Sequence, residues 1–144
     1  SIEIYLMPGK QAKTKDKLPK EFTIKKEDLP TMPFIKDDEI ELFDTSSYKI
    51  TFSKEAAERI GALKPSLPVG IPFVLTIDRE PILTGYFVNE LSSFGCAAYV
   101  MSNSSNSVQE LQKGLPEQHY KTQIVEKRTN FLLVQALERT GRLK

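Results

Sequence analysis

The apolar run that ends at Ile77 constrains the fold of this chain more than any other part of its sequence. Nearly every residue from Pro72 to Ile77 is apolar. A strand that is hydrophobic on both faces is usually an interior strand, because both faces must be covered. Residues 78–81 have turn composition, and Ile82–Val88 again has strand composition. The two apolar segments therefore predict an antiparallel hairpin, with Phe73–Ile77 in the interior of a sheet.

The residues before this hairpin predict a strand followed by a helix. Apolar and polar residues alternate from Tyr48 to Phe52, as in a strand with one buried face. Ser53 suits the N-cap of a helix, because its hydroxyl can accept hydrogen bonds from the free amides of the first turn. One apolar stripe follows at helical spacing, formed by Ala56, Ile60 and Leu63. Prolines beyond this stripe end the helix.

Weaker patterns predict the remaining elements. We expect strands at Ile2–Met7, Ala97–Met101 and Tyr120–Val125, a one-turn helix near 37–40 and a short helix at Val108–Lys113. A last helix is expected after a cap at Thr129 or Asn130. Its predicted buried face consists of Phe131, Leu133, Val134 and Leu137.

Together these elements predict an α+β fold. It has a mixed or mainly antiparallel sheet of about five to six strands, with two to three helices packed mainly on one face. Gly85, inside the second strand of the hairpin, leaves three alternatives: a bulge, a close approach of another backbone, or a tolerated twist in an ordinary strand. The length of 144 residues predicts one domain, residues 1–144, whose hydrophobic core is large enough to be stable without disulfides or bound metals.

The composition excludes several classes of protein. The formal net charge of +1 argues against nucleic acid as a partner, because a nucleic-acid binder needs a basic face. No apolar stretch approaches the roughly 18 residues that span a bilayer. The single cysteine permits no internal disulfide. Nucleotide-binding glycine motifs, a calcium loop and a set of zinc ligands are all missing, so we predict no cofactor and no metal.

One pair of residues offers catalytic chemistry. Cys96 follows Gly95 at a loop-to-strand transition, and His119 could activate it as a thiolate nucleophile. The alternative, which we favour, is a small buried cysteine and a separate surface histidine. The carboxylate pairs Asp37/Asp38 and Glu39/Glu41 offer a second route, since sugar hydrolysis uses two carboxyls that flank one cleft. Nothing in the sequence shows that any two of them converge.

A lysine-rich segment at about residues 8–30 is predicted to be a long exposed loop. Apolar residues are sparse in this segment. The one regular element that its sequence suggests is a short strand at Phe22–Ile24. Weak candidates for binding an anionic surface are Lys13, Lys15 and Lys17. The alternative, which we favour, is a solvated loop without a partner.

Two segments resemble the strand–helix–strand unit of the extracytoplasmic domain of SecD-type protein-export subunits. They are Tyr48–Ala57 and Gly70–Asp78, with the sequences YKITFSKEAA and GIPFVLTID. Small secreted or lipid-anchored bacterial proteins of unknown function share this pattern, and they close with a helix and a Gly-basic-Leu tail, as Asn130–Leu143 does here. The resemblance covers about half of the chain and implies an α+β fold, an extracytoplasmic address and no catalytic residues.

These observations favour a non-enzymatic extracytoplasmic binding or interaction domain. Its expected partner is another protein or peptide that binds through a sheet edge. A small hydrolase that uses Cys96 and His119, or a carboxylate pair, is the alternative. The chain begins at Ser1 rather than at methionine, and we expect that an export signal or a lipid anchor preceded it; a trimmed sequence is the other explanation.

Overall fold

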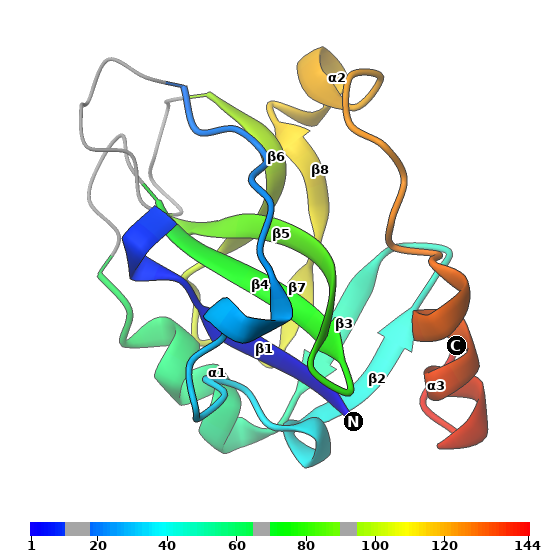
Figure 1. Cartoon of the computed structure of the whole chain (residues 1–144). Coiled ribbons are helices and arrows are strands. Elements are labelled where there is room, and N and C mark those ends of the chain that lie inside the picture. Colours follow the sequence, from blue (N-terminus) through cyan, green and yellow to red (C-terminus); the bar gives the residue numbers. More distant parts are fainter. Residues whose placement is uncertain (11–17, 65–69, 90–94) are drawn as a thin grey trace.

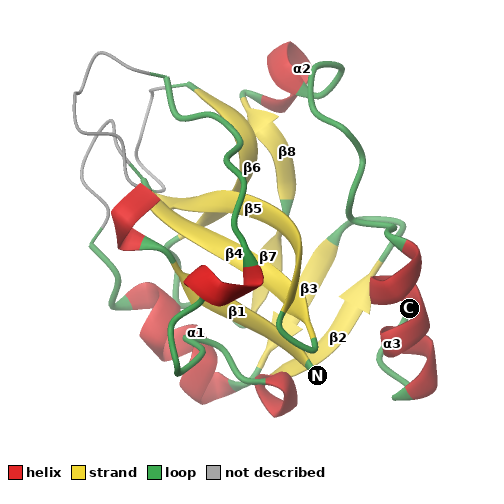
Figure 2. Ribbon diagram, viewed as in Figure 1, coloured by secondary structure: helices red, strands yellow, loops and turns green. Residues whose placement is uncertain are grey.

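The computed structural model describes residues 1–10, 18–64, 70–89 and 95–144. Within these residues, eight strands form two sheets (Figures 1 and 2). The larger sheet contains, in spatial order, β1 (Ile2–Leu6), β4 (Ile71–Ile77), β5 (Glu80–Val88), β6 (Cys96–Ser102) and β8 (Gln112–Leu115). The smaller sheet contains β2 (Ile40–Asp44), β3 (Lys49–Phe52) and β7 (Val108–Glu110).

Three α-helices accompany the sheets in the described part of the chain: α1 (Lys54–Gly61), α2 (Glu117–Tyr120) and α3 (Phe131–Arg139). Single 3-10 turns lie at η1 (Pro8–Lys10), η2 (Lys26–Asp28) and η3 (Asp37–Glu39). The larger sheet is mixed, because β6 runs parallel to β5 while its other pairings are antiparallel. The predicted α+β class is confirmed, although the strands divide between two sheets.

The interior position predicted for Phe73–Ile77 is also confirmed. β4 lies between β1 and β5 and pairs antiparallel with both, and residues 72–77 are all buried. The hairpin to β5 closes through Asp78 and Arg79, which have φ values of 48° and 65°. Positive φ at both central residues is the geometry of a two-residue type I′ turn, whose twist matches that of the paired strands.

One face of the larger sheet meets the main hydrophobic core. This core joins side chains of both sheets to α1 and α3, and it includes Phe73, Phe43, Phe52, Ile60 and Leu137. The opposite face carries two smaller clusters, around Tyr5 and Tyr86. Residues 18–29, here called the covering segment, lie across that face (Figure 1). The covering segment contains no strand at Phe22–Ile24, and only Lys20 makes a bridge, to Ala97 of β6.

Two strand edges are occupied by other parts of the chain. Ile4 of β1 exchanges backbone hydrogen bonds with Ile35, whose N–H donates to the Ile4 oxygen at 3.0 Å. Phe43 of β2 bonds in the same way with the C-terminal residues: its N–H donates to the Arg142 oxygen and its oxygen accepts from Lys144, both at 2.9 Å. The chain therefore closes these edges with its own backbone, as soluble sheet proteins commonly do.

The predicted helix caps are present. The Ser53 hydroxyl accepts from Ala56 N at 3.2 Å, and the Asn130 side chain accepts from Leu132 N at 2.9 Å. At the end of α3, Gly141 has φ 69°, its N–H donates to Glu138, and the next N–H donates to Leu137. This pair of bonds is a Schellman motif, which requires a residue with positive φ and so favours glycine.

Three local predictions are wrong. Val108–Lys113 is not a helix but parts of β7 and β8, because Gln109 pairs with β3 and Gln112 with β6. Tyr120–Val125 is not a strand; it contains the end of α2 and turns. Of the face predicted for α3, Leu133 and Leu137 are buried and Val134 is half-buried, but Phe131 is 74% exposed and Ala136 is buried in its place. The strand β2 had no predicted counterpart.

Gly85 is the site of a close backbone approach, one of the alternatives left open by the sequence. A Cβ at Gly85 would collide with the carbonyl oxygen of Tyr99 on β6 and would lie 2.8 Å from Phe73 Cζ. Gly85 and Tyr99 are also register partners at the point where β5 and β6 begin to pair. The missing side chain therefore permits this contact between the two parallel strands.

Replacing Gly85 tests this contact. We expect G85A to lower the free energy of unfolding by about 2–3 kcal/mol, because the added methyl group meets main-chain atoms that cannot rotate away. G9A is the matched control, since nothing lies within 4 Å of a Cβ at Gly9. Urea unfolding followed by circular dichroism measures both. Equal unfolding midpoints for the two variants would contradict the proposed contact.

Candidate functional site

A groove lies beside the first half of β5. Its volume is about 160 Å³, and it is lined by Phe22, Thr23, Ile24, Pro81, Ile82, Leu83, Thr84 and Lys127. Three parts of the chain that are distant in sequence therefore meet there: the covering segment, β5 and the connection between α2 and α3. Five of the eight lining residues are apolar, and the other three, Thr23, Thr84 and Lys127, are polar. This arrangement is typical of a small binding site.

The groove exists because β5 and β6 separate. Their parallel pairing begins only at Gly85, opposite Tyr99, and continues to Val88. Among the described residues, no strand pairs with residues 80–84 on the side opposite β4. The register between β4 and β5 also shifts here, since Leu75 is opposite Leu83 while Thr76 is opposite Pro81. Ile82 is thus a bulged residue, and a bulge bends its strand and ends regular pairing.

The covering segment is held beside the groove mainly through its backbone. The Thr84 hydroxyl donates to the Phe22 carbonyl oxygen at 2.8 Å, and the Tyr86 hydroxyl donates to the Lys20 oxygen at 2.7 Å. The Phe22 and Tyr86 rings contact edge to face, with centroids 5.7 Å apart. These bonds place Phe22 and the residues after it against one side of the groove.

Lys127 lies on another side of the groove and is positioned through its main chain. Its N–H donates to the Tyr99 hydroxyl at 2.8 Å, and that hydroxyl donates to the Val125 carbonyl oxygen at 2.6 Å. Burial raises the pKa of Tyr99 to about 12, so the phenol stays protonated and keeps donating at ordinary pH. A core tyrosine thus fixes the residue that brings a positive charge to the groove.

The next residue, Arg128, anchors the same connection. Its guanidinium stacks 3.5 Å from the centre of the Tyr48 ring and is almost fully buried. It makes a bidentate pair with Glu126, at 2.9 and 2.7 Å, and donates to the Leu111 carbonyl oxygen at 3.0 Å. The hydrogen bonds from Arg128 lower the pKa of Glu126. A paired and hydrogen-bonded buried charge is tolerated, whereas removal of one partner is costly.

The Lys127 side chain lies close to the carboxylate of Glu21. Its Nζ lies 3.7 Å from Glu21 Oε1, which is too long for a hydrogen bond. Among the described residues, that Glu21 oxygen is buried without any hydrogen-bond partner. The lysine side chain is 40% exposed. Its ammonium donors therefore remain free to bind a ligand, with only a weak electrostatic tie to Glu21.

Cys96 is placed where a nucleophile would be inaccessible. Its side chain lies in the cluster with Tyr86, Ala98 and Val100, and the residue is 1% exposed. Burial raises the pKa of the thiol to about 12, which disfavours the thiolate. His119 is exposed on α2 and contacts the Tyr120 ring, and no hydrogen bond joins it to Cys96 in the described structure. The placement matches the interpretation of a small buried cysteine.

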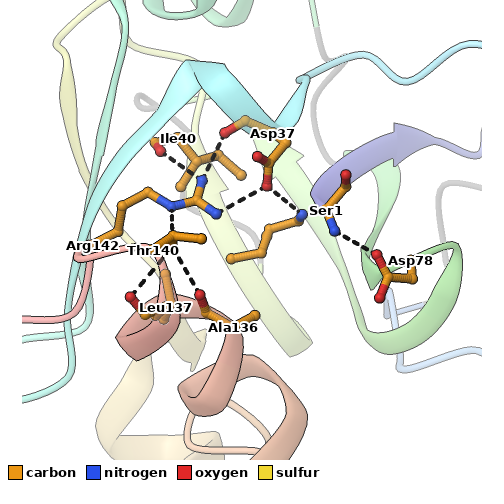
Figure 3. Close-up of polar contacts among 9 residues, drawn as sticks. Ser1, Asp37, Ile40, Asp78, Ala136, Leu137, Thr140 and Arg142 are labelled. Atoms are coloured by element: carbon orange, nitrogen blue, oxygen red, sulfur yellow. Dashed lines mark hydrogen bonds and ion pairs between the residues drawn. The ribbon is translucent and has the colours of Figure 1, made fainter.

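The carboxylate candidates are engaged by different arginines. Asp37 Oδ1 accepts from Ile2 N at 2.6 Å and from Arg142 at 3.0 Å, and Arg142 also donates to the Asp37 and Ile40 carbonyl oxygens (Figure 3). Glu39 is paired with Arg59. Burial would raise the pKa of both carboxyls, but these hydrogen bonds outweigh it and lower the pKa. The two groups therefore stabilise the fold as carboxylates.

The other members of these pairs, Asp38 and Glu41, are exposed. The lysine candidates Lys13, Lys15 and Lys17 lie outside the described residues. Within the described ranges, no three His, Cys, Asp or Glu side chains gather as a metal site would require. No helix in that part of the chain is long and apolar enough to cross a membrane.

Comparisons with protein families, with curated proteins and with solved structures find no match for this chain. The groove is therefore defined by its own geometry. Sequence reasoning missed all of its lining residues as a site. Two signals were available, namely Pro81 at the boundary between the predicted turn and the predicted strand, and the apolar residues Phe22 and Ile24 in a lysine-rich loop, but neither shows that these segments meet.

The burial of Cys96 predicts slow chemistry at its thiol. We expect a maleimide to label the native protein at least ~1,000-fold more slowly than the urea-unfolded protein, because labelling requires the chain to open. The double variant C96A/T129C is the control, since Thr129 is exposed and its replacement should react at once. Rapid native labelling at Cys96 would restore the nucleophile hypothesis.

The Glu126–Arg128 pair predicts that the stability of the protein depends on pH. A carboxyl whose pKa is lowered by folding stabilises the protein above the unfolded pKa of about 4.3, and that contribution is lost as the pH falls through the folded value. We expect E126Q to lower the free energy of unfolding by about 0.5–1 kcal/mol at pH 7, because Glu126 is exposed and solvent screens its pair with Arg128. The difference from the unsubstituted protein should shrink toward pH 3.

Urea titrations at a series of pH values measure this difference. E41Q is the matched control, because Glu41 is exposed on β2. A loss of stability in E126Q that stays constant from pH 7 to pH 3 would contradict the assignment.

Proposed function

We propose that this protein is a non-enzymatic interaction module that binds a short extended segment of a partner protein in the groove beside β5. The observation that carries this proposal is the unpaired half of β5. Residues 80–84 have a strand on one side only among the described residues, and the groove lies against them. Glu80 is exposed and Pro81 and Ile82 are half-buried, whereas Leu83 and Thr84 are buried and Thr84 bonds to the covering segment, so the open part of this edge is residues 80–82. A free sheet edge next to apolar side chains is a common site of peptide recognition.

The size of the groove favours a peptide over a small-molecule substrate. Sites for drug-sized ligands usually enclose about 300–1,000 Å³, whereas this groove has about 160 Å³. A volume of that size suits one or two aliphatic side chains. Phe22, Ile24 and Ile82 offer the apolar contacts for them.

The backbone of β5 limits how such a segment binds. Pro81 has no N–H, so it offers no donor to an added strand. The bulge and the proline also discourage pairing between copies of this chain, as is usual at protected edges. A partner must therefore gain affinity from side chains in the groove as well as from main-chain bonds.

The proposed non-enzymatic character is supported by the state of the catalytic candidates. Cys96 is packed in an apolar cluster, while Asp37 and Glu39 are held by separate arginines. We also propose an extracytoplasmic location, with attachment through a lipid anchor. The resemblance of residues 48–57 and 70–78 to the domain of the export subunits supports this location.

Filling the groove tests the proposal. Thr23 is exposed and lines the groove, so T23W should occupy the space without disturbing the core. We expect a displayed library of random octapeptides to yield sequences that bind the unsubstituted protein, and T23W to weaken their binding at least tenfold. T122W, at an exposed threonine outside the groove, should bind them normally.

Binding is measured by fluorescence anisotropy with the selected peptides. Circular dichroism of T23W and T122W checks that both variants are folded. The proposal fails if the library yields no binder, or if the selected peptides bind T23W and T122W equally.

A further inference from the structure

We infer that Lys127 binds the C-terminal carboxylate of the partner segment, so that the groove recognises a chain end with an aliphatic last residue. This inference rests on the proposed function and adds the chemical class of the ligand. It depends on three features of the described residues: the free donors of Lys127, the apolar lining opposite it, and the short length of the unpaired half of β5.

Lys127 is the charged residue among those that line the groove. Its neighbour Glu21 is 3.7 Å away and makes no hydrogen bond with it. The nearby Glu126 is already bonded to Arg128 in bidentate fashion, with Lys113 Nζ at 3.8 Å. A carboxylate from outside would therefore meet an ammonium group whose hydrogen-bonding capacity is unused.

The position of Lys127 is fixed before any ligand arrives. Its N–H is bonded to the Tyr99 hydroxyl inside the core, and the next residue is anchored by stacking on Tyr48. Only the lysine side chain must order on binding, which keeps the entropic cost low. Glu21 acts as an internal competitor, because it offers the same kind of charge at a poorer distance.

The residues that line the groove determine which side chain can bind there together with the carboxylate. Phe22, Ile24 and Ile82 surround the space next to Lys127 with apolar surface. The volume admits one or two side chains, and the unpaired stretch of β5 ends at Gly85, where β6 takes over. A chain that ends in the groove fits these limits better than one that must enter and leave it.

Small model ligands test the inference directly. The probe is N-acetyl-leucine, which combines an aliphatic side chain with a free carboxylate, and its matched partner is N-acetyl-leucinamide. We expect the acid to bind about fivefold more tightly than the amide, in the range of a partly exposed charged pair. Two-dimensional NMR titration measures both affinities and shows whether residues 22–24, 81–84 and 127 respond.

Two variants separate a ligand contact from a structural role. K127Q should reduce binding of the acid to that of the amide and leave the amide unchanged. E21Q should strengthen binding of the acid, because it removes the internal competitor, and should also leave the amide unchanged. T23W should abolish binding of both ligands. A merely structural lysine would not give opposite effects in K127Q and E21Q.

Equal binding of acid and amide, unchanged acid binding in K127Q, or no binding of either ligand to the groove would each overturn the inference. The library selection judges the proposed function separately, because it needs no carboxylate. The α-amide of N-acetyl-leucyl-aspartic acid, whose only carboxylate is on a side chain, completes the series. If it binds as tightly as N-acetyl-leucine, the assignment to a chain end is wrong.

Discussion

The contact between Gly85 and the Tyr99 carbonyl decides where the two parallel strands of the larger sheet meet. Because no Cβ separates them, β5 and β6 approach closely at this point and pair from there to Val88. On the other side of it, β5 has no strand partner opposite β4 among the described residues, and the bulge at Ile82 bends β5 there. The groove is the consequence, since a sheet that was regular throughout would have closed this space.

Tyr99 also connects the sheet to the rest of the site. Its backbone meets Gly85, while its hydroxyl holds the main chain at Val125 and Lys127. Arg128 extends this connection to Tyr48 at the start of the smaller sheet. One residue of β6 therefore determines both where β5 is free and where the charged side chain stands. For this reason, a substitution that disturbs the sheet at Gly85 should also change the position of Lys127.

Local signals predicted the parts of the fold that local energetics decide. The hairpin at Asp78, the Ser53 cap and the end of α3 at Gly141 each depend on a few neighbouring residues. The segment at 108–115 was assigned wrongly because its state is set by distant partners: β7 pairs with β3, and β8 pairs with β6. Pairing over long sequence distances overrides short-range preference, which is weak for such a segment.

The groove could not be predicted from the sequence for the same physical reason. Its lining comes from three segments that carry no chemical motif and meet only through tertiary contacts, such as the bond from Thr84 to Phe22. Pro81 illustrates the difficulty. In the sequence it signals a turn, whereas in the structure it removes a donor from a strand that has a neighbour on one side only. The same residue that protects this edge from indiscriminate pairing leaves space beside β5, and the proposed ligand would occupy that space through its side chain and its charge.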